Sequence, residues 1–273
     1  MDESLSQWLG LREPADVAAR SELLTRTIAD ALPAGEPVCA LDLATGTGSN
    51  IRYLIDRLPG RQRWLAVDRS ATLLMDLRER MSSLDCEIET RQVDLGTLDD
   101  REIFAGRHLV TASALLDLVS AQWLGALAAH CRGAGASALF TITYNGRSSC
   151  MPVEPEDDWV RDLMNRHQKT DKGLGGPALG PGAVSCAERQ FAEAGYCVRR
   201  EPSDWTLGPE VSALQQMLID GWAQAAIEMA PDRSTTIARW RERRLAHVDA
   251  GRSRIVVGHD DLAAWLPRSE GPR

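Results

Sequence analysis

The stretch that decides the fold is PVCALDLATGTGSN, residues 37–50. Its N-terminal half, PVCALDL, is an apolar run of the kind found in parallel strands that are buried on both faces. Gly46 and Gly48 then mark a tight turn, and Ser49 or Asn50 is suited to start a helix. A helix that begins directly after such a turn offers free backbone N–H groups to the polar atoms of a ligand. The stretch therefore predicts a strand, a ligand-binding turn and a helix.

The alternation of strand and helix continues after this stretch. Strand-like runs lie at 63–68, 86–95, 108–116 and 136–145, and helical patterns lie at 49–58, 71–81 and 120–132. Strands that alternate with helices predict an α/β fold with a parallel, doubly wound sheet and helices on both of its faces. Ligands of such sheets bind outside the carboxyl ends of the strands.

Acidic residues stand at the ends of the first three strands. They are Asp42, Asp68 and Asp94. The carboxyl ends of parallel strands meet at one edge of a sheet, so all three carboxylates are expected near the glycine turn. Asp68 is suited to accept hydrogen bonds from both hydroxyls of a ribose. Each residue alone also fits a helix cap or a loop position, so the prediction rests on their joint pattern.

This joint pattern resembles the class I S-adenosylmethionine-dependent methyltransferases. The resemblance covers roughly residues 38–145. After the acidic residue the family has G-x-G-x-G, whereas this sequence has alanine in place of the first glycine. The corresponding residues are Ala44, Thr45, Gly46, Thr47 and Gly48.

The resemblance implies S-adenosyl-L-methionine as the cofactor. By this resemblance the turn holds the methionine portion, Asp68 holds the ribose, and Asp94 with the backbone N–H of Leu95 meets the adenine. The segment from Ser113 to Leu116 then lies in the floor under the sulfonium, and Arg20 meets the cofactor carboxylate unless it is a surface arginine. The expected cofactor-binding residues are Arg20, Asp42, Ala44, Thr45, Gly46, Thr47, Gly48, Asn50, Asp68, Arg69, Asp94, Leu95 and Ser113.

We expect one methyltransferase-like domain over residues 1–273, with a seven-stranded, Rossmann-like sheet. Its parts are an N-terminal helical cover at 1–36, with a helix at 12–32, a cofactor-binding core at 37–145, a lid insertion at 146–183 and a C-terminal part of the sheet at 184–273. The C-terminal part adds strands at 196–201 and 253–258 and an excursion of two helices, 210–229 and 233–249. The lid is inferred from its glycines, prolines and charges, because long loops in compact domains usually cover a site.

Catalytic residues are expected near the lid. Methyl transfer depends on alignment of the acceptor, and a hydroxyl acceptor also benefits from a base. His167, in the predicted lid, is the candidate base, with a solvated lid residue as the alternative. Tyr144 and Asn145, at the end of a strand, are candidates to orient the acceptor. Asp117 is a candidate acceptor contact or a helix cap.

Charge suggests the kind of acceptor. Basic residues gather in the lid of an otherwise acidic chain of net charge −8, namely Arg147, Arg161, Arg166, Lys169 and Lys172. They favour a small, polar or anionic acceptor that is methylated on oxygen or nitrogen, although pairing with nearby acidic residues explains them equally well. The acidic chain argues against a nucleic-acid partner, as does the absence of the family's Asn-Pro-Pro-Tyr signature.

Further features of the sequence indicate where in the cell the protein acts and leave two other functions open. The sequence lacks a secretion signal and a membrane-length apolar stretch, which predicts a cytoplasmic protein without a membrane partner. No metal site is expected, because no two of the six cysteines form a C-x-x-C pair. An NAD(P)-dependent oxidoreductase stays open, although the third glycine of G-x-G-x-x-G is absent. A non-catalytic S-adenosylmethionine-binding module also stays open, as does the oligomeric state, with a homodimer among the options.

Overall fold

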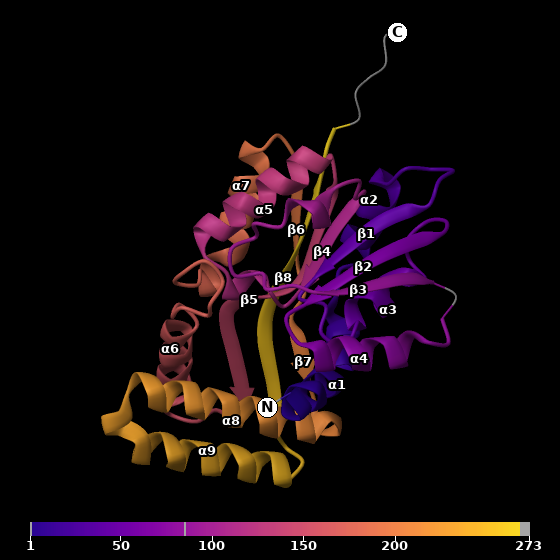
Figure 1. The fold of residues 1–273 in the computed structure, drawn as a ribbon. Coiled ribbons are helices and arrows are strands. Elements are labelled where there is room, and N and C mark those ends of the chain that lie inside the picture. The colour runs from indigo at the N-terminus through magenta and orange to yellow at the C-terminus, as the bar shows by residue number, and fades with distance from the viewer. Residues whose placement is uncertain (1, 85, 268–273) are drawn as a thin grey trace.

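The computed structural model describes residues 2–84 and 86–267. Within these residues an eight-stranded sheet has the order β3-β2-β1-β4-β5-β8-β6, with the short β7 beside β8 (Figure 1). The strands are β1 Val38–Leu43, β2 Gln62–Asp68, β3 Glu87–Gln92, β4 Leu109–Ser113, β5 Ser137–Met151, β6 Cys197–Pro202, β7 Trp205–Leu207 and β8 Arg254–Trp265. β1 to β5 are parallel, and β8 runs antiparallel to β5, β6 and β7. The doubly wound fold is confirmed, and β7 is a strand beyond the seven expected.

Helices cover both faces of this sheet. They are α1 Asp2–Ala19, α2 Glu22–Ala31, α3 Ser49–Ile55, α4 Ala71–Met81, α5 Ala121–Ala134, α6 Asp157–His167, α7 Ala183–Glu193, α8 Ser212–Met229 and α9 Ser234–Asp249. Alternate side chains of a strand point to opposite faces, so Leu41 and Leu43 pack with α5 and α7, whereas Val38 and Ala40 pack with α2, α3 and α4. None of the helices in the described ranges has both the length and the apolar character that a bilayer crossing requires.

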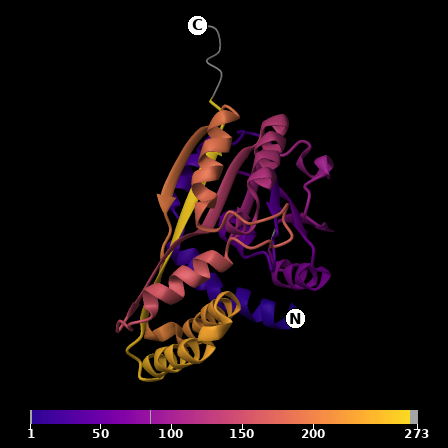
Figure 2. The same cartoon turned by 90° about the vertical axis from the view of Figure 1, so that its left-hand side faces the viewer.

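A third hydrophobic cluster lies beyond the sheet. The far ends of β5 and β8 carry Cys150 and Ile255 into it, where they pack with α6, α8 and α9. Trp8 and Leu11 of α1 pack against the same cluster. Figure 2 shows the α8–α9 hairpin and α6 below the sheet, apart from the helices that cover its faces. The C-terminal helical excursion therefore has a core of its own, to which α1 is attached.

The helix expected at 12–32 is two helices. Ser21 has an extended backbone (φ −72°, ψ 105°), and its hydroxyl accepts a hydrogen bond from the backbone N–H of Leu24 at 3.2 Å. This is an N-cap, which starts α2 as a new helix. Pro14, expected in a first turn, lies inside α1. The break lets α1 follow a different direction and contact α4, α8 and β7.

The two strands at the centre of the C-terminal half are longer than expected. β5 continues past Asn145 to Met151, and β8 continues past Gly258 to Trp265. The two strands remain paired along these extensions, with register shifts next to Thr143 and Tyr144. The start of the segment predicted as a lid, residues 146–151, is thus part of the sheet.

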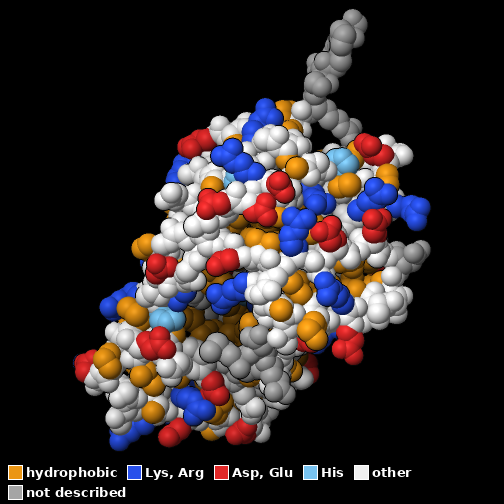
Figure 3. Space-filling model, in the orientation of Figure 1, with side chains coloured by type: hydrophobic (Ala, Val, Ile, Leu, Met, Phe, Trp, Pro, Cys, Tyr) orange, Lys and Arg blue, Asp and Glu red, His pale blue; other side chains and the backbone are white. Residues whose placement is uncertain are grey.

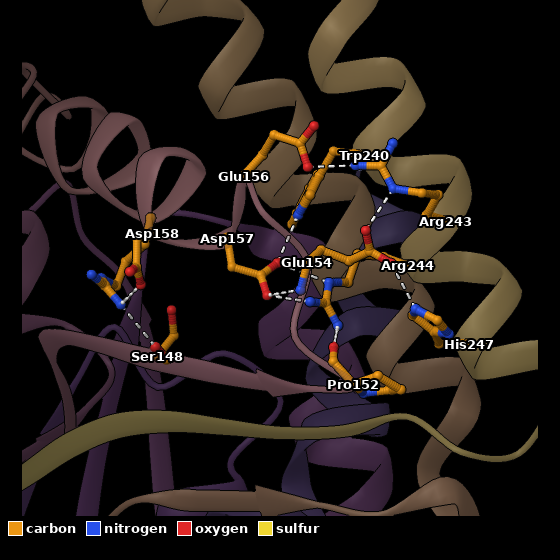
Figure 4. Close-up of polar contacts among 11 residues, drawn as sticks. Ser148, Pro152, Glu154, Glu156, Asp157, Asp158, Trp240, Arg243, Arg244 and His247 are labelled. Atoms are coloured by element: carbon orange, nitrogen blue, oxygen red, sulfur yellow. Dashed lines mark hydrogen bonds and ion pairs between the residues drawn. The ribbon is translucent and has the colours of Figure 1, made fainter.

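A buried ion pair connects α9 to the segment after β5. Arg244 is fully buried, its Nε donates to Asp157 Oδ1 at 2.9 Å, and its Nη1 donates to the carbonyl of Pro152 at 2.6 Å (Figure 4). Nη2 forms a second ion pair with the same carboxylate. Trp240 also donates to Asp157 through Nε1 at 2.8 Å. The start of α6 is therefore held against α9 by a fully buried guanidinium and a carboxylate that is only 15% exposed.

We expect Arg244→Ala to lower the free energy of unfolding by about 3 kcal/mol or more, because it leaves the Asp157 carboxylate without its buried counter-charge. Arg241 of the same helix, which pairs with Asp220 at the surface, provides the control. Arg241→Ala is expected to change stability by at most about 1 kcal/mol. Urea denaturation of both variants measures the difference, and equal losses would contradict a structural role for the buried pair.

Candidate active site

The turn after β1 depends on left-handed backbone conformations. Gly46 has φ 55° and Gly48 has φ 80°. A Cβ at Gly48 would lie 2.9 Å from Cγ of Leu77 in α4, so that position has room only for glycine. Ala44, which replaces the family's first glycine, also has a positive φ of 49°. A non-glycine residue in this region is strained by about 1–2 kcal/mol.

The buried carboxylate of Asp42 holds the turn to α3. It accepts hydrogen bonds from the Thr45 hydroxyl at 2.5 Å and from Nδ2 of Asn50 at 2.6 Å. Burial raises the pKa of Asp42 to about 6, and the two hydrogen bonds oppose this rise. Asn50 Nδ2 also donates to the hydroxyl of Thr111 in β4. Strand, turn and helix are thus joined by side chains that exclude water.

Asp68, at the end of β2, lies on the other side of the turn. Its side chain accepts hydrogen bonds from the backbone N–H groups of Gly46 and Ser70, each at 2.9 Å. Ser70 in turn is the N-cap of α4. The carboxylate therefore fixes the glycine turn from one side and starts a helix on the other. Farther along the same edge, Asp94 accepts a hydrogen bond from the N–H of Gly96 at 2.9 Å.

Arg20 lies behind the turn, at the junction of α1 and α2. Its guanidinium donates to Asn50 Oδ1 at 2.7 Å and to Ser113 Oγ at 3.1 Å, and it stacks over the ring of Tyr53. Burial lowers its pKa, and the nearby carboxylates of Asp16, Asp261 and Asp42 oppose this change. Within the described part of the chain, its Nε has no hydrogen-bond partner.

A cavity of about 310 Å³ opens at the ends of β1, β2 and β4. All the expected cofactor residues line it except Gly48 and Arg20, which lie directly behind its wall. The face seen in Figure 3 is hollowed, with hydrophobic side chains on the floor of the hollow and Lys or Arg side chains at its border. The structure thus brings together residues that are distant in sequence but were expected at one site.

Other lining residues were not expected from the sequence. They are Leu5, Leu9, Arg12 and Asp16 of α1, Ser49, Ser70, Leu73 and Val93 near the first strand ends, Leu118 after β4, and Lys172, Gly173 and Leu174 of the loop after α6. Ala114 and Leu115, which were expected in the floor, also line the cavity. Lys172 was singled out only as one of several lid cations. The start of α1 was missed because the predicted helix began at residue 12.

The expected catalytic residues do not line the cavity. His167 ends α6, and its Nε2 pairs with Glu228 of α8 at 2.9 Å. The Tyr144 hydroxyl donates to Asn165 at 2.8 Å, and Asn145 Nδ2 donates to Asp260 at 3.0 Å. Burial raises the pKa of Tyr144 above its usual value. A catalytic role for these three residues stays a prediction, and their present contacts argue against direct action on a ligand in the cavity.

Comparison with known proteins identifies the domain that carries this site. Residues 40–134 match a family model described as a methyltransferase domain. This part of the chain is therefore similar to a methyltransferase domain. The match includes β1, the glycine turn, and the residues at the ends of β2, β3 and β4, and it favours a methyltransferase over the oxidoreductase that the glycine turn alone left open. A search of curated proteins found none that matches this chain.

Solved structures are similar to this chain at low sequence identity. The YcgJ protein from Bacillus subtilis has a TM-score of 0.50 and 13% identity over 89% of this chain and 98% of that one. A putative sarcosine dimethylglycine methyltransferase from Galdieria sulphuraria has 0.47 and 12%, over 92% and 85%. The cyclopropane synthase MmaA2 from Mycobacterium tuberculosis has 0.47 and 12%, over 88% and 82%.

The residues of the cavity fit S-adenosylmethionine. Arg20 Nε and Thr47 Oγ1 are buried polar atoms without a partner among the described residues. Thr47 lines the cavity, and Arg20 lies behind it in contact with Asn50 and Ser113, which line it. The Asp68 carboxylate, at the end of β2, also lines the cavity and offers acceptor oxygens that suit ribose hydroxyls. When bound, this cofactor supplies a methyl group on a positively charged sulfur. The described residues contain no group of three or more His, Cys, Asp or Glu side chains placed to hold a metal.

We expect Asp68→Ala to weaken S-adenosylhomocysteine binding at least about tenfold, because it removes charge-assisted hydrogen bonds to the ribose and the anchor of the Gly46 N–H. Asp56→Ala removes the same charge at an exposed position after α3 and should leave binding unchanged. Calorimetric titration measures both variants. Wild-type affinity in Asp68→Ala would show that this carboxylate only caps α4.

Proposed function

We propose that the protein transfers a methyl group from S-adenosylmethionine to an oxygen or nitrogen atom of a small, polar or anionic molecule. The observation that supports this proposal is the composition of the cavity beyond the expected cofactor residues. Two cations line it, Arg12 from α1 and Lys172 from the loop after α6. Cations at a cavity of this size favour a small molecule with polar or negatively charged groups.

The contacts of the two cations indicate that they contribute differently to acceptor binding. Arg12 is held by both oxygens of Asp16, at 2.9 and 3.3 Å, so most of its charge is already paired. The amine of Lys172 donates to the hydroxyl of Thr170 at 2.9 Å and has no paired carboxylate at ion-pair distance among the described residues. Burial lowers the pKa of Lys172. We infer that Lys172 contributes the attraction for an anionic group of the acceptor.

The loop that carries Lys172 supports the proposed lid. The backbone N–H of Ser120 donates to the carbonyl of Leu174 at 3.1 Å, and the N–H of Leu179 donates to that of Val119 at 2.8 Å. These bonds hold the loop across the end of β4. A Cβ at Gly96 would lie 3.1 Å from the carbonyl oxygen of Gly173, so the loop also lies close to the third strand end. We propose that it opens to admit ligands and closes over them.

We propose indirect roles for His167, Tyr144 and Asn145, because none of them lines the cavity. We propose that Tyr144 and Asn145 fix the wall behind the acceptor through Asn165 and Asp260. For His167 to act as a base, its ring would have to leave Glu228 when the lid moves. Without that movement the pairing of His167 with Glu228 has a structural role, because it connects the end of α6 to α8.

The proposed transfer can be tested directly. Protein incubated with a cell extract and S-adenosylmethionine labelled in the methyl group should place the label in the low-molecular-weight fraction. Mass spectrometry of the labelled product should show a methyl group on oxygen or nitrogen. Label in protein or nucleic acid, or a new carbon–methyl bond, would contradict the proposal.

We expect Lys172→Ala to raise the KM for the acceptor about tenfold, because one charge-assisted hydrogen bond is lost. The Kd for S-adenosylhomocysteine should change little. Lys169 lies on the same loop but is exposed and outside the cavity lining, so Lys169→Ala is the matched control. Steady-state kinetics with the identified acceptor decides, and equal KM values for the two variants would remove Lys172 from acceptor binding.

A further inference from the structure

The segment that follows β3 is attached to α5 by two side chains of that helix. Nε1 of Trp123 donates to the carbonyl of Leu95 at 2.6 Å, and Nε2 of His130 lies 3.0 Å from the carbonyl oxygen of Leu98. Trp123 and His130 stand at positions i and i+7 of α5, so they lie on one face of the helix. Only the first bond is made to a residue of the cavity, because Leu95 lines it whereas Leu98 does not.

The indole that makes this bond is held from several sides. Trp123 is 2% exposed and packs in the same hydrophobic cluster as Leu95. The hydroxyl of Ser120, which is the N-cap of α5, accepts a hydrogen bond from the backbone N–H of Trp123 at 3.1 Å. Gly175 of the loop after α6 lies close by, since a Cβ there would be 3.2 Å from Cβ of Trp123 and 2.8 Å from the Ser120 hydroxyl. Trp123 is therefore fixed in place when it holds the Leu95 carbonyl.

Val93, Asp94 and Leu95 line the cavity directly after β3 and form what we call the β3 wall. Oδ1 of Asp94 accepts a hydrogen bond from the N–H of Gly96 at 2.9 Å. The N–H of Leu95 forms no hydrogen bond within the described part of the chain. The β3 wall thus offers a ligand carboxylate oxygens as acceptors and one backbone donor, beside the apolar side chain of Val93.

Adenine matches the β3 wall in shape and in hydrogen-bonding groups. It is a flat ring whose edge carries an amino donor next to a ring nitrogen that accepts, and such edges are read by hydrogen bonds in apolar pockets. Because β3 is the neighbour of β2 in the sheet, a nucleoside whose ribose meets Asp68 can place its base at this wall. The amino group then suits the Asp94 carboxylate, and the ring nitrogen suits the Leu95 N–H.

We propose that Trp123 is a positioning residue that makes the cofactor site selective for adenine. This inference rests on the proposed use of S-adenosylmethionine. Because the indole N–H holds the Leu95 carbonyl at a buried position, that oxygen is not available as a further acceptor in the β3 wall. Without the indole N–H the carbonyl loses its buried partner, and its peptide gains free energy by turning to another donor.

Hypoxanthine differs from adenine at the two groups that the β3 wall would contact. It has a carbonyl oxygen in place of the amino group and an N–H in place of the accepting ring nitrogen. Its oxygen would therefore face the Asp94 carboxylate, and its ring N–H would face the Leu95 N–H. A site rejects such an analogue because its own polar groups stay unpaired. A Leu95 carbonyl that Trp123 no longer holds can instead accept from the ring N–H of hypoxanthine.

The test compares S-adenosylhomocysteine with S-inosylhomocysteine, which carries hypoxanthine in place of adenine. We expect wild-type protein to bind the adenosyl compound at least about a hundredfold more tightly, because two groups of the inosyl compound are mispaired. Trp123→Phe removes the indole N–H and keeps an aromatic ring, so it should reduce this ratio of dissociation constants about tenfold. Calorimetric titration measures both ligands on both proteins.

Two further variants are matched controls. His130→Phe removes the bond to Leu98 in the same segment and keeps a ring against Phe104, on which His130 stacks. Trp64→Phe removes another buried indole donor, which bonds to Gln62 of β2 at 3.2 Å. Both variants should keep the wild-type ratio, because neither changes a bond of the β3 wall.

The outcomes separate the inference from the cofactor on which it rests. No binding of either ligand to wild type would overturn both together. Equal binding of the two ligands to wild type, an unchanged ratio in Trp123→Phe, or an equal change in His130→Phe would overturn the inference alone. If Trp123→Phe does not fold, β-(3-benzothienyl)alanine at position 123 replaces it, because this residue keeps the shape of the indole with sulfur in place of N–H. Its ratio should also fall about tenfold, and a wild-type ratio would contradict the role of Trp123.

Discussion

The buried carboxylate of Asp42 is the interaction on which the site depends. It ends β1, and its two oxygens hold the Thr45 hydroxyl and the Asn50 amide. Asn50 in turn donates a hydrogen bond to Thr111 of β4 and accepts one from Arg20 at the α1–α2 junction. A carboxylate buried this deeply persists only where its hydrogen bonds are complete. Strand, turn, first helix and N-terminal cover are therefore fixed by one polar network, and a change at any member alters the shape of the cofactor pocket.

The core of the fold was predictable because its physics is local. A strand buried on both faces is a continuous apolar run, and a glycine turn between such a strand and a helix is visible in the sequence without the rest of the chain. The three acidic strand ends were predictable for a related reason, since parallel strands end at one edge. Asp42, Asp68 and Asp94 do line one cavity. The pattern did not predict the strained, positive φ of Ala44, which appears only in the structure.

The features that were missed are those fixed by distant contacts. β8 was predicted only to Gly258 because the next residues, His259, Asp260 and Asp261, do not look like a buried strand. They are nevertheless buried. Asp260 accepts hydrogen bonds from Arg200 and Asn145, and Asp261 accepts them from the N–H groups of Ser21 and Ile142. Partners that lie far away in sequence make a polar strand stable here, and no local pattern reveals them.

The same distinction between local sequence features and long-range contacts applies to the two halves of the site. The cofactor half is built from consecutive strand ends and is readable from sequence, whereas the other half is assembled from α1, the loop after α6 and the turn after β4. These elements come from three distant parts of the chain and meet only because the helical excursion has a core of its own that receives α1. The two cations that these elements bring to the cavity differ in their contacts, because Arg12 is paired with Asp16 whereas the amine of Lys172 donates to the hydroxyl of Thr170. The side chains around Asp42 complete their hydrogen bonds within the fold, so the cofactor half has its shape before a ligand arrives. The other half depends on contacts between elements that are far apart in the sequence, which is why no local pattern predicted it.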